Sequence, residues 1–324
     1  MPLQHYIPAT FLANFSKSIL TPRRDSLISV GDRRTGKCFT AAISKVAAIQ
    51  DLYTLFSFPP ALSALHVDQA MGEYESDLDR AINELIHDKL SAFTWAKVLV
   101  PFVAGFLVRG PDFDIRFKNR LERMEGFSVS EFEDLLNRPF SDNINLARVR
   151  ERTDLLAPIM AAKWMLLETT GNDPLIINDL GYVGMKGGYV EVGVQQDIGP
   201  TFPLGLGHML AVIPQARRKV AVERKGEWVP LIERNKLIRD NHIGFNTLAG
   251  RYARRFIFGP DEETVHRYLI AEANPPSEPI PEPSQMGFVH RASESVIGME
   301  WYRVLDTLAN PPKSRGAWVR VDLT

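Results

Sequence analysis

Apolar positions recur at helical spacing through the first half of the chain. Between residues 67 and 93 they fall every three or four positions, opposite an acidic face that reads as solvated, which is typical of an amphipathic helix. Residues 93–108 are apolar on almost every side, so a second, centrally buried helix is expected there. Residues 146–169 carry another helical stripe. The pattern therefore predicts a helical subregion over residues 65–170.

Elsewhere the spacing and the turn residues favour strands. Two β-prone runs flank a glycine-bounded polar turn within residues 26–40, which indicates a hairpin. Short apolar runs at residues 175–177 and 208–213 enclose a glycine-rich middle, and a second hairpin is indicated over residues 219–232. Helical spacing returns over residues 235–256, so we expect a helix there that packs on the sheet.

These elements predict an α+β fold, in which a helix-rich central region packs on a mainly antiparallel sheet. The N-terminal hairpin and the strands after residue 174 form that sheet. The sheet subregion comprises residues 20–40 and 174–260. We expect residues 1–270 to be one domain, followed by a Pro-rich linker or strap at 271–284 and a C-terminal helix-strand extension at 285–324.

The composition narrows the class of protein. The chain has 324 residues, of which 45% are hydrophobic and 24% charged, and its net charge is -1; these are the proportions of a folded chain without a global basic field. Its single cysteine, Cys38, excludes an intramolecular disulfide and a multi-cysteine zinc site. Without a recognisable leader or a long apolar span, a cytoplasmic location and no membrane partner are expected. The oligomeric state is left open.

The polar residues that call for an explanation lie at element ends. His5 and Tyr6 come just before a short helix expected at residues 9–15, and Asp179 directly follows a predicted strand beside glycines that let the backbone approach closely. Asn241 and Asn246 lie in or beside the apolar face of the helix at 235–256. Buried amides must be hydrogen-bonded, so these two either tie the helix to a strand or line a cavity.

Positive charge gathers in residues 215–255. This segment holds eleven Lys and Arg against four acidic residues. Together with Trp228, Tyr252 and Phe256, it suits phosphate contact and base stacking, so nucleic acid is a candidate partner. The alternative is that these cations pair with the acidic helix face of residues 73–84 inside the same chain.

A resemblance begins at the N-terminus. Residues 5–8 read His-Tyr-Ile-Pro and are followed by Phe11-Leu12 and by Phe15. This opening resembles that of a bacterial family known as domain of unknown function 4238, whose members begin with His-Tyr-x-Pro and an aromatic-Leu-x-x-Phe helix.

Later segments are similar to the family in the same order, so the resemblance spans residues 4–259. They include a helix ending in Arg-x-Pro at residues 106–111, a strand followed by Asp179, and an Asn-rich helix that runs into an aromatic strand at 241–258. Where the family has Ser-Asp-Asn-Pro, residues 178–181 read Asn-Asp-Leu-Gly, which keeps only the aspartate in register. The resemblance implies no particular activity or cofactor, but it singles out the same polar residues.

Two functions from different classes follow as hypotheses. The first is a phosphodiester-directed hydrolase, similar to a nuclease, for which a role in bacterial defence is conceivable. Histidine serves as acid or base near neutral pH, and the guanidinium group of arginine binds phosphate through two parallel hydrogen bonds. The candidate catalytic residues are His5, Tyr6, Asp179 and Asn246, and the candidate substrate-binding residues are Asn241, Arg251, Arg254, Arg255 and Arg109. Asp179 is also the candidate ligand for a divalent metal, Mg²⁺ or Mn²⁺.

The second hypothesis is a non-catalytic module that binds nucleic acid or protein, in which the His-Tyr-x-Pro motif is structural. A buried polar network that pins the N-terminus to the sheet would account for the same residues without chemistry. The sequence contains no HExxH, P-loop or nucleophile-elbow motif. The hydrolase hypothesis predicts that His5, Asp179 and Asn246 converge in one cavity.

Overall fold

The computed structural model describes most of the chain up to residue 271. The described ranges are 2–57, 62–122, 139–170, 173–183, 199–214, 220–237 and 239–271. The linker and extension predicted after residue 271 lie outside them, so those two predictions stay open.

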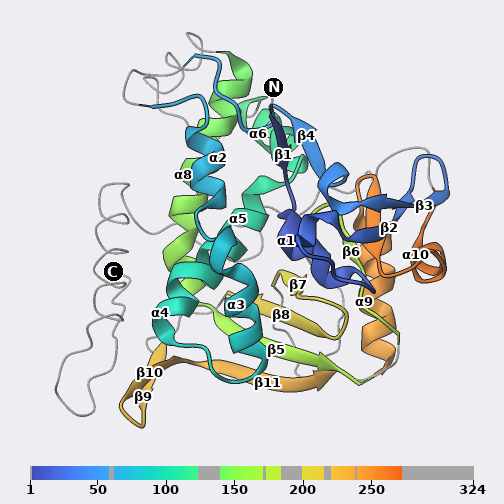
Figure 1. Ribbon diagram of the computed structural model, residues 1–324. Coiled ribbons are helices and arrows are strands. Elements are labelled where there is room, and N and C mark those ends of the chain that lie inside the picture. The colour runs from blue at the N-terminus through green and yellow to red at the C-terminus, as the bar shows by residue number, and fades with distance from the viewer. Residues whose placement is uncertain are drawn as a thin grey trace.

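The strands form two separate four-stranded sheets (Figure 1). The first contains, in spatial order, β11 (Ile232–Leu237), β5 (Lys163–Thr169), β8 (His208–Ile213) and β7 (Thr201–Pro203). The second contains β3 (Lys37–Ala42), β2 (Leu27–Asp32), β12 (Phe256–Gly259) and β6 (Ile177–Asn178). Every pairing is antiparallel except β11 with β5, which is parallel.

Two antiparallel ribbons complete the strands. They are β1 (Leu3–His5) with β4 (Ala48–Gln50), and β9 (Ala221–Arg224) with β10 (Glu227–Pro230). The ribbon β9–β10 and the β2–β3 hairpin confirm the two predicted hairpins. The hairpin predicted over residues 26–40 and the strand predicted over 208–213 are present. The single predicted sheet is two sheets, because the β2–β3 hairpin joins β12 through β2, whereas β8 pairs with β5 and β7.

The helices cluster between residues 66 and 161 and again after residue 239. The first group is α2 (His66–Gly72), α3 (Glu75–Ile86), α4 (Ala92–Thr94), the π-helical η4 (Trp95–Leu99), α5 (Val100–Arg109), α6 (Asp112–Glu122) and α8 (Phe140–Ala161). The second is α9 (Arg239–Tyr252) and α10 (Glu262–Tyr268). Short turns α1 (Ala9–Leu12), η1 (Ala13–Phe15), η2 (Arg23–Asp25) and η3 (Ile43–Lys45) lie near the N-terminus. These elements confirm the predicted α+β class.

The first sheet separates two hydrophobic cores, because successive side chains of a strand point to opposite faces. On β5, Trp164 and Leu166 face the core shared with α3, α5 and α8, while Met165 and Leu167 face the core shared with α9. The helix predicted over 235–256 therefore packs on the sheet, although its first residues belong to β11.

Two predicted helices end earlier than expected. The helix predicted over 146–169 ends at Ala161, and Lys163–Thr169 is the central strand β5. A short apolar run fits the spacing of a helix and that of a buried strand equally well. Here the segment is a strand because it pairs with β8 and β11. The helix predicted over 67–93 is α2 and α3, separated at Glu73 and Tyr74.

The apolar segment after residue 92 is confirmed as a buried helical run. In the described part of the chain, Ala92–Arg109 is long and apolar enough to cross a membrane, yet 83% of it is buried inside the protein. Ser91 caps its first turn by accepting a hydrogen bond from the Thr94 amide. Its far end, at Arg109, lies beside several buried arginines and carboxylates.

Candidate functional site

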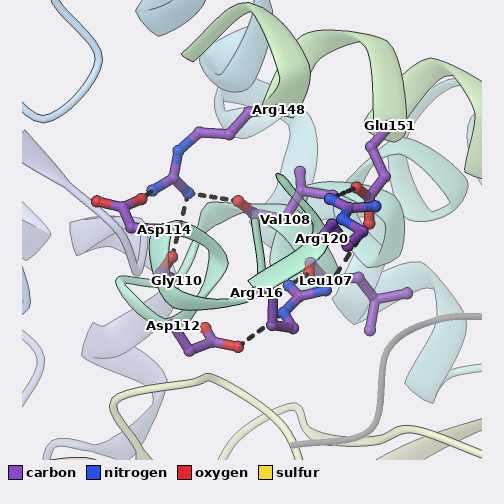
Figure 2. A network of polar contacts seen from close by, with 9 residues as sticks. All are labelled: Leu107, Val108, Gly110, Asp112, Asp114, Arg116, Arg120, Arg148 and Glu151. Carbon is purple, nitrogen blue, oxygen red and sulfur yellow. Dashed lines mark hydrogen bonds and ion pairs between the residues drawn. The ribbon is translucent and has the colours of Figure 1, made fainter. Parts of the chain in front are cut away.

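The C-terminal end of α5 is capped by side chains of other elements (Figure 2). The last carbonyls of a helix lack partners within it. Here Arg116 Nη2 donates to the Leu107 oxygen at 2.6 Å, and Arg148 Nη1 donates to the oxygens of Val108 and of Gly110. The cationic guanidinium groups also oppose the negative end of the helix dipole. The end of α5 is therefore fixed in place.

Acidic side chains balance these buried arginines. Arg116 pairs with Asp112 at 3.2 Å, Arg148 pairs with Asp114, and Arg120 pairs with Glu151 at 2.6 Å (Figure 2). All three acceptor residues come from α6 or α8, so the network joins α5, α6 and α8 into one block. Each arginine is paired with a carboxylate of the same network, so we interpret the network as a rigid support rather than a place for substrate.

Arg109, the last residue of α5, connects this block to the N-terminal strand. Its guanidinium is buried and donates to the His5 carbonyl oxygen at 2.9 and 3.2 Å. It also pairs with Glu75 at 2.6 Å and donates to Tyr74 Oη at 3.2 Å. Arg109 was expected to bind substrate; these contacts give it a positioning role beside His5, and a direct contact with substrate stays a prediction.

The imidazole of His5 is half-buried and only partly satisfied. The backbone of Ile43 and Ser44 hydrogen-bonds the ring, whereas Nε2 is buried without a hydrogen-bond partner among the described residues. Burial, followed by the charge of Arg109, lowers the pKa of His5, and Glu75 opposes this shift. A ring held on one side by backbone, with a free nitrogen on the other, is the arrangement of a proton-transfer histidine.

Two carboxylates accompany the His5 ring. Glu75, at the start of α3, keeps 29% of its side chain exposed next to Arg109. Asp68, on α2, is half-buried; burial raises its pKa, while Arg109, a Gln4 hydrogen bond and His5 act in the opposite direction. The ring thus lies in a partly exposed site with two carboxylates and one fixed guanidinium.

Tyr6 and Asp179 lie together on the other side of the N-terminal strand. Tyr6 is buried, and its pKa is raised first by burial and then by the charge of Asp179. The Asp179 carboxylate accepts hydrogen bonds from the backbone amides of Arg254, Arg255 and Phe256 at 2.8, 2.6 and 3.0 Å. Burial nevertheless raises the pKa of Asp179 to about 6. Asp179 therefore clamps the turn that joins α9 to β12.

The arginines at the end of α9 differ in their surroundings. Arg255 is 50% exposed, pairs with Asp32 at 3.2 Å and stacks on the Phe256 ring at 4.5 Å. Arg251 is exposed, and Arg254 is half-buried. Tyr6 is electrostatically coupled to Arg255 as well as to Asp179, so the predicted arginines and the predicted Tyr-Asp pair lie in one neighbourhood.

Asn246 has other partners than this group of residues. Asn246 is fully buried, accepts from the Ile176 amide at 3.1 Å and donates to the Pro174 oxygen at 3.0 Å. Both ends of its amide thus tie α9 to the segment before β6, as one reading of the sequence expects. Asn241 also lies in α9, but its side chain is outside the described part of the structure.

The predicted residues are therefore brought together in part. His5 with Arg109, and Asp179 with Arg254 and Arg255, form two polar groups that meet at Tyr6. Two cavities in the described part of the chain, one beside Glu168 and His208 and one beside Ser29 and Thr40, are not lined by His5, Asp179 or Asn246. The single cavity predicted for these three residues is thus not among the described ones, and their catalytic roles stay predictions.

Comparison with known proteins places the chain in a family. The family model described as "Protein of unknown function (DUF4238)" matches residues 3–265, which is most of the chain. The chain belongs to the DUF4238 family. No curated protein and no solved structure matches it. The DUF4238 match ends within α10, so it covers both sheets and both helix groups.

A metal site is not evident in this DUF4238 protein. Within the described residues, no group of three or more His, Cys, Asp and Glu side chains could hold a metal ion. Both oxygens of Asp179, the predicted ligand, already accept backbone hydrogen bonds. A divalent-metal requirement stays a prediction to be tested with the activity.

Sequence reasoning missed the carboxylates beside His5. The acidic positions of residues 73–84 were expected to be a solvated face with local pairs. The local pairs are present, between Arg80 and both Asp77 and Glu84. Distant arginines use the face as well: Glu75 pairs with Arg109, Glu73 with Arg152 and Asp79 with Arg23. Asp68 and Glu75 are seven residues apart within one predicted helix, and residues at this spacing lie on the same helix face. This spacing could have indicated that the two carboxylates lie close together.

Proposed function

We propose that this protein is a hydrolase directed at phosphodiester bonds, in which His5 transfers the proton. The observation that supports this most is the free, buried Nε2 of His5 beside Asp68, Glu75 and Arg109. Buried polar atoms are normally satisfied, so an unsatisfied imidazole nitrogen next to two carboxylates is costly unless it has a use.

The electrostatics around His5 suit a general base. Because burial and Arg109 lower its pKa, the ring is neutral at pH 7 and its Nε2 lone pair can accept a proton from water. The oxygen of that water would attack phosphorus while the bond to the leaving oxygen breaks. The imidazolium that forms would then give this proton to the leaving oxygen, and the carboxylates of Asp68 and Glu75 would stabilise its positive charge.

The arginines at the end of α9 support the choice of a phosphodiester. Arg251 and Arg255 are exposed, and the Asp179 clamp fixes the backbone that carries Arg254 and Arg255. Planar guanidinium groups match phosphate oxygens well. In this proposal the end of β1, where Tyr6 follows His5, lies between the proton-transfer group and the phosphate-binding group.

The test is cleavage of labelled single- and double-stranded DNA and RNA by the purified protein in Mg²⁺, Mn²⁺ or EDTA. We expect His5→Ala to abolish cleavage and Asp68→Asn to slow it by about 100-fold or more. His266→Ala removes an exposed histidine on α10 and is the matched control, expected to leave cleavage unchanged. Added imidazole should partly restore His5→Ala, which a purely structural histidine would not allow.

An exposed basic surface supports a second candidate function, the binding of nucleic acid without cleavage. Arg224 and Lys225 on the β9–β10 ribbon, and Arg234 and Lys236 on the edge strand β11, are all exposed. Trp228, expected to stack on bases, is buried in the core, and this weakens the case. Arg234 also reaches the end of α3 through the Leu85 and Ile86 oxygens.

The binding function predicts salt-sensitive retention of labelled strands that survives His5→Ala. The paired change Arg224→Glu and Lys225→Glu should weaken such retention and reduce its dependence on salt. Unchanged retention in that variant would rule out this surface. A cytoplasmic location and a role in bacterial defence remain proposals attached to either function.

A further inference from the structure

The proposed site at His5 contains one carboxylate that has no cation of its own. Glu75 is paired with Arg109 at 2.6 Å, so the protein itself uses that charge. Asp68, on the neighbouring helix α2, is half-buried and forms no ion pair with any of the described residues. Its charge acts on the His5 ring, which places the carboxylate beside the proposed base. Asp68 is therefore a hydrogen-bond acceptor that a ligand of this site can reach.

Gln4 fixes the surroundings of Asp68. The Gln4 side chain is buried, and its Oε1 accepts a hydrogen bond from the Tyr53 amide at 2.6 Å. Because the carbonyl end of the Gln4 amide is engaged in this way, its NH₂ end is the one that faces Asp68. Burial raises the pKa of Asp68, and the Gln4 amide opposes this shift. The two oxygens of a carboxylate offer about four acceptor positions, so Asp68 can still accept from a ligand.

The position of Asp68 limits what it can contact in a bound phosphodiester. A carboxylate repels the phosphate oxygens and needs a cation or a hydrogen-bond donor. In the part of the chain that the structure describes, no group of three or more His, Cys, Asp and Glu side chains could hold a metal ion, which favours a donor from the substrate. In a nucleic acid, the hydroxyl nearest to an internal phosphodiester is the ribose 2′-hydroxyl, on the carbon next to the one that carries the 3′-oxygen. DNA has no donor there.

We propose that the substrate of the His5 site is RNA, and that Asp68 recognises it by accepting a hydrogen bond from the ribose 2′-hydroxyl. This inference rests on the proposed function, and it assigns the choice of sugar to one side chain. Water remains the attacking group, so no bond of the 2′-oxygen forms or breaks. Arg251 and Arg255 would contact phosphates, which RNA and DNA share, and so they contribute affinity without distinguishing the two.

The first test measures binding without cleavage, in the full chain carrying His5→Ala. Fluorescence anisotropy compares a labelled single-stranded RNA with the DNA and the 2′-O-methyl RNA of the same sequence. We expect RNA to bind about tenfold more tightly than the other two, because only RNA has the 2′ proton to donate. Adding Asp68→Ala should reduce the ratio of the RNA and DNA affinities to about one.

Asp77→Ala is the matched control, because it removes a carboxylate of α3 whose side chain is 41% exposed and pairs with Arg80. It should keep the preference for RNA. The proposal is overturned if RNA and DNA bind alike before Asp68 is changed, or if 2′-O-methyl RNA binds as tightly as RNA. It is equally overturned if the preference survives Asp68→Ala.

Cleavage by the natural sequence separates this inference from the proposed function. A kcat/KM at least about tenfold higher for RNA than for DNA would support both. Equal cleavage of RNA and DNA would keep the hydrolase and overturn the recognition by Asp68. Cleavage of neither would overturn the hydrolase, and the affinity ratios would then decide the inference by themselves. A 2′,3′-cyclic phosphate product would also overturn it, because the 2′-oxygen would then attack phosphorus.

Discussion

At the scale of single residues, burial lowers the pKa of His5 and raises the pKa of Asp179. His5 keeps one unsatisfied nitrogen and a lowered pKa, so it is suited to accept protons. Asp179 accepts three backbone hydrogen bonds, yet burial still raises its pKa. In the proposed function the first residue accepts a proton, whereas the second maintains a turn.

Asp179 predicts a pH dependence of stability. Its pKa in the folded protein, about 6, lies above that of an unfolded aspartate, so the folded state binds the proton more tightly. The free energy of unfolding from this group is therefore largest at acid pH and falls by about 3 kcal/mol as the pH rises through 6. Thermal unfolding between pH 4 and 7, compared with Asp179→Asn, measures this slope.

In Asp179→Asn the slope between these pH values should disappear, because the amide does not titrate. The variant should also be less stable overall at acid pH, since one amide oxygen cannot accept all three backbone hydrogen bonds. An unchanged slope would show that other groups cause it.

The sequence identified several of these residues but not their environments. His5, Tyr6 and Asp179 stand out because each lies at the end of an apolar element. Asp68 and Glu75 were hidden within an ordinary acidic helix face, and only the fold brings Arg109 to them. A single sequence does not reveal which surface charge a distant arginine will cover.

At the scale of elements, the end of α5 organises the molecule. Its carbonyls are capped by arginines from α6 and α8, and its last residue holds the N-terminal strand. The run of residues 93–108 could be predicted as buried helix because it is apolar on nearly all sides. Its polar caps could not, since they come from positions up to 40 residues away.

Arg148 tests the importance of these caps. Arg148→Met keeps the apolar stem but leaves the carbonyls of Val108 and Gly110 without their side-chain donor, and Asp114 loses its partner. We expect the free energy of unfolding to fall by about 3 kcal/mol. Arg80→Met, which removes an exposed arginine paired within α3, should cost less than about 1 kcal/mol. Denaturant titration of both variants checks this, and equal losses would contradict it.

Two glycines test the packing of the Asp179 turn against α5. Gly181 and Gly226 both have positive φ, +82° and +84°, but an added Cβ at Gly181 would lie 1.9 Å from the Phe106 ring, whereas Gly226 faces open space. Gly226→Ala should cost about 1 kcal/mol from the backbone alone. Gly181→Ala should cost about 1–3 kcal/mol more. Melting temperatures of the two variants give the comparison; a milder Gly181→Ala would contradict the packing.

At the scale of the whole molecule, the chain forms two sheets with helices between and around them (Figure 1). The α+β class could be predicted from the spacing of apolar residues along the chain. The division into two sheets could not be predicted, because it depends on β12 pairing with β2 and on β11 pairing with β5 in parallel. Such long-range pairings leave no mark in local spacing.

The domain boundary expected near residue 270 gives a prediction for the whole chain. The core residues that the structure describes lie between Tyr6 and Leu269, and the family match ends at residue 265. A chain that ends at Ala271 should therefore keep the melting temperature of the full chain within a few degrees. Loss of cooperative unfolding in the shortened chain would place the boundary elsewhere.

The most direct test of the central proposal is the rate of phosphodiester cleavage as a function of pH, measured for the natural sequence and for His5→Ala. The account predicts a rate that rises with pH and levels off at neutral pH, with a midpoint below the ordinary pKa of histidine, because burial and Arg109 lower the pKa of His5. The His5→Ala variant should cleave far more slowly, and its residual rate should lack this rise with pH. A folded His5→Ala variant that cleaves with the same rate and pH profile would contradict the account, as would a folded natural protein that cleaves none of the four nucleic acids.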